Sequence, residues 1–158
     1  MKFELTINIY RPLPQVFAFV TLPENDFYWQ YGTLVSEKIS KGEMGEGTLF
    51  RTVGHFMGRR LEIIHGVTEF QSNQRYGFKS QSGPIDLQTL YTFEVMKGST
   101  RISLSTQLIL GEPFKSNLFA AEKTVKKEYK ENLALLKDVL ESTRAELPLP
   151  RTLLVSKR

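Results

Sequence analysis

The sequence predicts an α+β domain in which a curved antiparallel sheet packs against one long C-terminal helix. Three observations carry this prediction. Residues 34 to 110 are a run of segments rich in β-branched and aromatic residues, separated by short turn signals. From about residue 115 to 143 the apolar residues instead recur every three or four positions, as in an amphipathic helix. The connections between the strand segments are too short for helical crossovers, which favours antiparallel pairing.

The first element expected is a strand over residues 3–9. FELTINI alternates apolar and polar side chains, which indicates one buried face. R-P-L-P ends this strand, and Pro14 suits the first turn of a short helix because the N–H it lacks would have no helical partner there. Apolar residues at helical spacing continue to Val20. A polar and aromatic connection follows, which carries the only tryptophan, Trp29.

Six strand segments joined by hairpins come next. A glycine-rich stretch at residues 42–47 separates the first two and raises the question of a phosphate-binding loop. Its spacing, G-x-x-G-x-G, is the reverse of the dinucleotide-binding pattern, and a strand follows it rather than a helix. We therefore interpret it as a tight hairpin turn. The six segments are TLVSEKIS, GTLFRTVGHF, RRLEIIHGVTEF, RYGFKS, LQTLYTFEV and RISLSTQLIL.

The length of 158 residues fits one domain, expected over residues 1–146. Pro148 and Pro150 cannot continue the long helix, so residues 147–158 are expected to form a C-terminal tail. Three interpretations of this tail remain open. It is disordered, it packs on the domain, or it docks on a second subunit to give a homodimer.

Composition excludes several classes of function. The chain has no cysteine, which excludes disulfides, thiol catalysis and zinc–thiolate sites. No apolar run is long enough for a transmembrane segment, and the N-terminus does not resemble a signal peptide, so we expect a cytoplasmic protein. The net charge is +4, but acidic and basic residues are interspersed, and no nucleic-acid partner is expected.

The two histidines lie in expected strands. His65 shares the parity of Leu61, Ile63 and Val67, which places it on the buried concave face, whereas the face of His55 is unclear. A histidine in a cavity acts as a general acid or base or binds a polar group of a ligand; the alternative is a structural role. No third ligand accompanies the histidines, so no metal site is expected, and nothing in the sequence indicates a cofactor.

Aromatic residues are the other candidates for a ligand-binding site. Tyr91 and Phe93 share one face of a strand, Phe78 is expected to point inward, and Tyr129 lies on the inner face of the long helix. Trp29 lies in the aromatic connection. For each of these residues the alternative is ordinary packing in the core or anchoring of a loop. With His65 they make up the predicted ligand-binding residues, and no catalytic residue is identified.

Several segments in order resemble the START and birch-pollen-allergen group, also called the SRPBCC superfamily, and most closely its polyketide cyclase/dehydrase type. After an alternating first strand come P-x-V-F-A-F-V (Pro14–Val20) and an aromatic loop with Trp29. G-E-G-T-L-F (Gly45–Phe50) and L-A-L-L-K-D-V-L-E (Leu133–Glu141) follow. The resemblance covers residues 2 to 143. It implies the helix-grip fold, in which a curved sheet wraps around the C-terminal helix and leaves a deep, mostly apolar cavity.

The resemblance also implies a range of functions. Members of the superfamily bind lipids, sterols, polyketides and other hydrophobic molecules, some cyclise or dehydrate polyketides, and others bind proteins. No catalytic residues are shared across it, so none can be assigned here. The sparse ionisable groups of this chain favour binding or transport of a small hydrophobic or amphipathic molecule. The alternatives are a cyclase or dehydratase that uses His65 and Tyr129, and a protein-interaction module.

Overall fold

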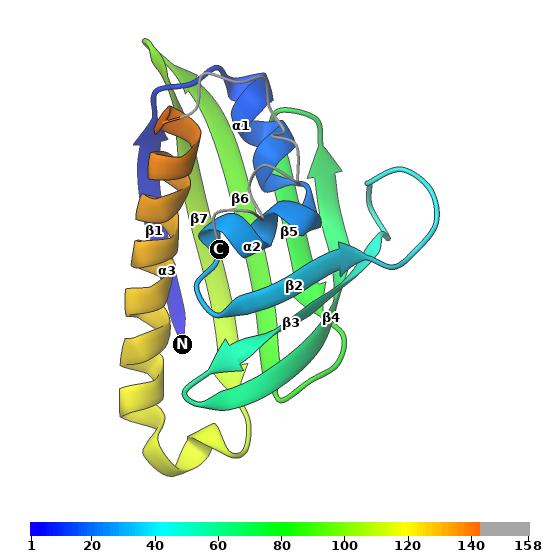
Figure 1. The fold of residues 1–158 in the computed structure, drawn as a ribbon, viewed down its shortest axis with the longest axis vertical. Coiled ribbons are helices and arrows are strands. Elements are labelled where there is room, and N and C mark those ends of the chain that lie inside the picture. The colour runs from blue at the N-terminus through cyan, green and yellow to red at the C-terminus, as the bar shows by residue number, and fades with distance from the viewer. Residues whose placement is uncertain (143–158) are drawn as a thin grey trace.

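A computed structural model describes residues 1–142, which form a seven-stranded antiparallel sheet with a long helix beside it (Figure 1). The elements are β1 (Lys2–Ile9), α1 (Leu13–Val20), η1 (Pro23–Asn25), α2 (Asp26–Trp29), β2 (Thr33–Lys38), β3 (Leu49–Phe56), β4 (Arg59–Gln71), β5 (Arg75–Ser80), β6 (Ile85–Met96), β7 (Ser99–Leu110), η2 (Phe114–Asn117) and α3 (Leu118–Ser142). The predicted α+β helix-grip architecture is confirmed. The predicted tail, residues 147–158, and the predicted domain end at residue 146 lie outside the described residues.

The sheet has the strand order β1-β7-β6-β5-β4-β3-β2. Strands β2 to β7 therefore form a meander, and β1 joins it at the far edge beside β7. The register shifts between Thr33 and Val35 in β2 and between Val67 and Glu69 in β4. Such bulges bend a strand and increase its twist, which helps the sheet to curve.

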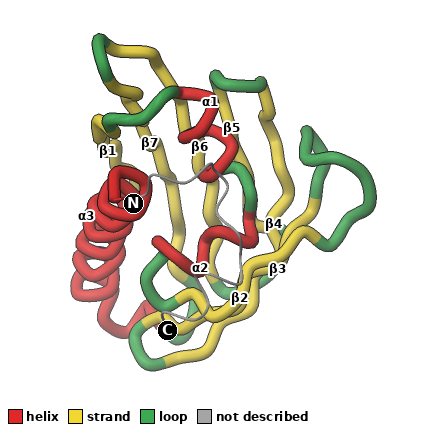
Figure 2. The backbone as a smooth tube through the Cα atoms, turned by 45° about the horizontal axis from the view of Figure 1, so that its top comes forward, coloured by secondary structure: helices red, strands yellow, loops and turns green. Residues whose placement is uncertain are grey.

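The helices α1, α2 and α3 lie on the inner side of the curved sheet, and α3 runs lengthwise beside β1 (Figures 1 and 2). The interior divides into two clusters of buried apolar side chains. One cluster joins α1 to the middle of the sheet and the last turns of α3, and it includes Phe17, Tyr91 and Leu136. The other gathers around the first turns of α3 and includes Leu108 and Val125. Tyr129 packs against both clusters, so it bridges the two halves of the core.

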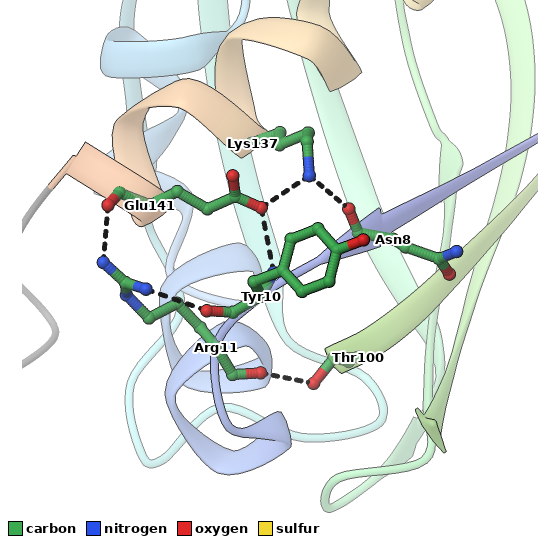
Figure 3. A network of polar contacts seen from close by, with 6 residues as sticks. All are labelled: Asn8, Tyr10, Arg11, Thr100, Lys137 and Glu141. Atoms are coloured by element: carbon green, nitrogen blue, oxygen red, sulfur yellow. Dashed lines mark hydrogen bonds and ion pairs between the residues drawn. The ribbon is translucent and has the colours of Figure 1, made fainter. Parts of the chain in front are cut away.

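Polar contacts hold the end of α3 to the chain between β1 and α1 (Figure 3). The Lys137 ammonium donates to the backbone oxygen of Asn8 at 2.8 Å and to the Glu141 carboxylate at 2.6 Å. The same carboxylate accepts a hydrogen bond from the Tyr10 amide at 2.9 Å, and Arg11 donates to the backbone oxygen of Glu141. These contacts fix the direction in which the helix crosses the sheet.

Three local predictions need correction. The connection after α1 is partly helical, because it contains η1 and α2. The long helix begins at Leu118 rather than near residue 115, because residues 114–117 form a 3-10 turn. The glycine-rich stretch is followed by β3, as expected for a turn, but β2 ends at Lys38 and β3 begins at Leu49. It therefore belongs to a long loop rather than a tight hairpin, with positive φ at Gly42 and Gly47.

Candidate functional site

A cavity of about 200 Å³ lies between the inner face of the sheet, α3 and the segment that follows α2. Its lining comes from both core clusters, because Phe50 and Tyr91 belong to the first and Leu108 and Val125 to the second. Most of the lining is aromatic or aliphatic, as in the binding sites of small apolar molecules. The polar and charged side chains in the lining are Asp26, Gln30, Tyr31, Thr33, Thr52, His55, His65, Tyr91, Glu128, Tyr129 and Asn132.

Four of the six predicted ligand-binding residues line this cavity: His65, Phe78, Tyr91 and Tyr129. The other two, Trp29 and Phe93, do not line it. Each is buried in the first core cluster. Trp29 packs edge-on against the lining residue Tyr91 at 6.5 Å between ring centroids, and Phe93 packs against Phe17 at 4.9 Å. For these two residues the structure fits the alternative that the sequence left open, which is packing in the core.

His65 is buried on β4 between aromatic rings. It stacks on Phe50 with 4.8 Å between ring centroids and meets Phe78 edge-on at 5.2 Å. Burial lowers the pKa of His65 to about 4, so the imidazole is neutral near pH 7. Its Nδ1 atom is buried with no hydrogen-bond partner among the described residues. Such an atom lowers stability unless water or a bound molecule pairs with it.

Asp26 is a residue of the cavity wall that the sequence analysis missed. It begins α2, and the Ser36 hydroxyl on β2 donates to its carboxylate at 3.1 Å. Burial raises the pKa of Asp26 to about 8, against the smaller opposing effect of the Ser36 hydrogen bond. The carboxyl group is therefore largely protonated near pH 7. Its position in a segment otherwise aromatic, D-F-Y-W, is the one sequence feature that pointed to burial.

Tyr129 brings its hydroxyl to the middle of two neighbouring strands, β6 and β7. Burial raises the pKa of this hydroxyl, while its hydrogen bonds with Thr106 and Thr89 act in the opposite direction. The two threonine hydroxyls lie 2.8 Å from each other, across β6 and β7. The ring of Tyr129 meets Phe3 edge-on at 5.3 Å. Tyr129 is thus held in place by a polar contact at its tip and an apolar contact along its ring.

The most exposed part of the lining is formed by Tyr31, His55 and the half-buried Glu128. Tyr31 is 70% exposed, and its backbone amide donates to the side-chain oxygen of Asn132 at 2.8 Å. The Asn132 amide group in turn donates to Gln30 at 3.1 Å. One buried asparagine on α3 therefore holds the segment after α2 across this side of the cavity.

A close backbone approach fixes the other end of the same segment. A Cβ atom placed on Gly54 of β3 would lie 2.6 Å from the backbone oxygen of Gly32. Gly32 itself has a φ of 79°, which favours glycine. Because neither glycine has a side chain, the start of β2 can lie close beside β3. Both glycines line the cavity.

Arg51 and the lysines in the first half of α3 do not line the cavity. Arg51 pairs with Glu37 at 3.0 Å and with Glu62 at 3.4 Å across β2, β3 and β4. The lysines of the basic stretch of α3, Lys123 to Lys130, are largely exposed, and Lys127 lies 3.8 Å from Glu131. Within residues 1–142 no group of three histidine, aspartate or glutamate side chains is arranged to hold a metal ion. No helix in that range is long and apolar enough to cross a membrane.

Comparison with known proteins identifies the fold, but it finds no relative by sequence. No family model and no curated protein matches the chain in sequence. Among solved structures, TTHA0849 from Thermus thermophilus is similar with a TM-score of 0.73 and 20% identity, over 90% of this chain and 100% of that one. The Zhui aromatase/cyclase from Streptomyces sp. R1128 is similar with a TM-score of 0.74 and 11% identity, over 89% of this chain and 93% of that one.

The structure of Ara h 8.0201 is also similar, with a TM-score of 0.67 and 13% identity over 90% of this chain and 99% of that one. These chains share the curved sheet and the long C-terminal helix at identities far too low to transfer residues. The expected resemblance to the START and birch-pollen-allergen group therefore holds for the fold.

Proposed function

We propose that this protein binds a small hydrophobic or amphipathic molecule in the cavity between the sheet and α3. The observation that supports the proposal is the lining itself, which is mainly aromatic and aliphatic and interrupts the core between its two apolar clusters. Burying an apolar molecule there contributes roughly 25 cal/mol per Å² of apolar surface removed from water. A cavity of about 200 Å³ suits a compact ligand, for example one or two fused rings or a short chain.

The predicted ligand-binding residues are proposed in the roles that their positions favour. Phe78 and Tyr91 supply aromatic walls, and His65 and Tyr129 supply polar atoms beside them. Trp29 supports Tyr91 from behind, and Phe93 packs in the adjoining core. Asp26 joins the set as a carboxyl group with no basic side chain beside it in the lining.

Mass spectrometry of the purified protein, first native and then denatured, tests the proposal. We expect a small molecule that leaves on denaturation and whose mass gives its chemical class. We also expect the neutral naphthalene dye prodan to bind with one site per chain and a blue-shifted emission. A protein that carries no small molecule and binds no prodan would contradict the proposal.

A second candidate function is catalysis of the cyclase or dehydratase type. It is favoured by one observation: the Asp26 carboxyl group has a pKa of about 8, within the range that suits a general acid or base near neutral pH. His65 and Tyr129 line the same cavity. If turnover of a polyketide-type substrate is found, folded Asp26→Asn and His65→Ala variants should each reduce it roughly a hundredfold or more, and unchanged turnover would remove that residue from the role.

A further inference from the structure

The charged side chains that line the cavity are all acidic apart from the two histidines. Asp26 and Glu128 are in the lining, and no lysine or arginine of residues 1–142 joins them. This contrasts with the whole chain, in which 21 basic residues outnumber 17 acidic ones. The lining therefore lacks the basic residues that predominate in the chain as a whole.

Among residues 1–142, neither acid of the lining has a cationic ion-pair partner. Within residues 1–142 no ion pair shorter than 4 Å involves Asp26 or Glu128. Burial raises the pKa of both carboxyl groups, and for Glu128 the charge of Glu131 adds to this while Lys127 opposes it. A carboxylate or phosphate placed in the cavity would add a negative charge where negative charge is already disfavoured.

The groups that surround Asp26 reinforce this bias. Glu24 from η1 acts on it as a like charge, and the hydroxyls of Tyr76 on β5 and Tyr91 on β6 are coupled to it. Ser36 on β2 occupies one carboxylate oxygen at 3.1 Å. None of these four groups is cationic. An ammonium group of a ligand would therefore meet no competing cation of residues 1–142 at Asp26.

The walls beside the acids suit the same kind of ligand. Phe50, Phe78, Tyr91 and Tyr129 present aromatic rings to the cavity. An ammonium group within about 6 Å of such a ring is attracted to its face, most strongly where water is excluded. The neutral imidazole of His65 adds no repulsion.

We propose that the ligand is an apolar amine, bound as a cation with its ammonium group against Asp26 and its hydrocarbon part between the aromatic rings. This inference rests on the proposed function, since it names the chemical class that the same cavity takes. Apolar carboxylates, fatty acids among them, are disfavoured because the lining offers no lysine or arginine of residues 1–142 to balance a buried negative charge.

Binding of such a cation changes the ionisation of Asp26. In the free protein the carboxyl group carries a proton near pH 7, and in the complex it faces an ammonium group and is ionised. The proton of the carboxyl group therefore leaves to the buffer when the ammonium ion binds. A neutral alcohol of the same shape releases no proton.

Three probes that share a naphthyl group and differ in the polar group test the inference: naphthylmethylamine, naphthylmethanol and naphthoate. Isothermal titration calorimetry near pH 7, in two buffers of different ionisation enthalpy, gives both the affinity and the number of protons released. We expect the amine to bind about tenfold more tightly than the alcohol, which corresponds to about 1.4 kcal/mol, and the carboxylate about tenfold more weakly. Proton release should accompany the amine alone.

Asp26→Asn separates the charge from the shape of the side chain, because the amide keeps the size and can still pair with Ser36. We expect it to bring the affinity for the amine to that for the alcohol and to abolish proton release, while the alcohol binds as before. Asp86→Asn removes an acid from an exposed position on β6 and should leave the preference for the amine intact.

Two results would overturn the inference in distinguishable ways. If prodan and the alcohol bind but the amine binds no better than the alcohol, or Asp26→Asn keeps the preference, the assignment of an amine is wrong and the proposed function stands. If neither prodan nor any of the three probes binds, the proposed function is wrong and the assignment falls with it.

Discussion

The Asp26 carboxylate on α2 lies 3.1 Å from the hydroxyl of Ser36 on β2, and Ser36 lies 3.2 Å from Thr52 on β3. Ser36 is 1% exposed and is the buried middle of this chain of polar side chains, whose two ends, Asp26 and Thr52, both line the cavity. Two hydroxyls do not balance a carboxylate charge as a basic side chain would. Burial, which raises the pKa of Asp26, therefore outweighs the Ser36 hydrogen bond, which lowers it, and Asp26 retains its proton near neutral pH.

The first prediction concerns stability at alkaline pH. The folded-state pKa of Asp26 is about 8, above its ordinary value of 3.8, so its contribution to stability is full below pH 3.8 and is lost as pH rises toward 8. Asp26→Asn should therefore raise the free energy of unfolding near pH ~8.5 by on the order of 2 kcal/mol relative to the wild type, and by less near pH ~5. The expected difference in unfolding free energy is smaller than the pKa shift alone would give, at about 1.4 kcal/mol per unit, because part of the Asp26 side chain faces the cavity. Urea unfolding at both pH values measures it, and equal pH slopes for the two proteins would show that Asp26 is ionised in the folded state.

The second prediction concerns stability in acid. Burial lowers the pKa of His65 from 6.5 to about 4, so its contribution to stability is present above pH 6.5 and is lost as pH falls toward 4. His65→Phe keeps an aromatic ring between Phe50 and Phe78 and should reduce the fall in unfolding free energy over this pH interval by roughly 1–2 kcal/mol. The matched control is His55→Phe at the exposed histidine. The prediction fails if both variants retain the wild-type slope.

A third prediction concerns the volume of the cavity. Val125 on α3 lines the cavity and is 6% exposed, so Val125→Phe should place its ring in the empty space. We expect the affinity for prodan to fall roughly tenfold or more while the far-UV circular dichroism is retained. Ala134→Phe adds the same ring on the exposed face of the same helix and should leave the affinity unchanged. Equal effects of the two variants would place the dye outside the cavity.

A fourth prediction concerns the contact between α3 and the segment after α2. Asn132 is 7% exposed and bonds to both the Tyr31 amide and Gln30. Asn132→Leu leaves those groups without their partner and should lower the free energy of unfolding by about 2 kcal/mol. Hydrogen exchange at the Tyr31 amide should accelerate well beyond the change in global stability. Glu131→Ala, at the exposed neighbouring position, is the control and should change stability by less than about 0.5 kcal/mol.

A fifth prediction concerns the polar contacts at the end of α3. Partial burial alone would raise the pKa of Glu141, but hydrogen bonds from Lys137 and from the Tyr10 amide lower it. The carboxylate therefore stabilises the fold above its ordinary pKa of 4.5, and this contribution is lost as pH falls through the lower folded-state value. Glu141→Gln should cost about 1 kcal/mol near pH 7 in thermal unfolding, because the groups are only partly buried. A stability equal to that of the wild type would show that backbone contacts alone hold the end of the helix.

The elements that could be predicted from the sequence are those whose pattern reports one buried face. The alternation in FELTINI corresponds to β1, and the three- and four-residue period after residue 117 corresponds to α3, because each pattern depends only on local geometry. The same parity placed His65 on the inner face of β4. The positions of Phe78, Tyr91 and Tyr129 in the cavity lining agree with this kind of reasoning.

The rest depends on contacts between distant parts of the chain. Asp26 lies in a short helix with no periodicity of its own, and it reaches the cavity because Asn132 and the Gly32–Gly54 approach hold the adjacent segment in place. Trp29 and Phe93 have the composition and parity of lining residues. In the structure, however, Trp29 packs against Tyr91 and Phe93 packs against Phe17. No local sequence pattern could reveal these contacts.

The division of the core into two apolar clusters also determines how the protein responds to hydrostatic pressure. Unfolding eliminates internal voids, so a cavity of about 200 Å³ contributes on the order of tens of mL/mol to the decrease in volume on unfolding. The empty protein is therefore easier to unfold by compression than a domain of equal thermal stability with a continuous core. A molecule seated between the two clusters removes this weakness, and resistance to compression thus reports occupancy of the cavity whatever the chemistry of its occupant.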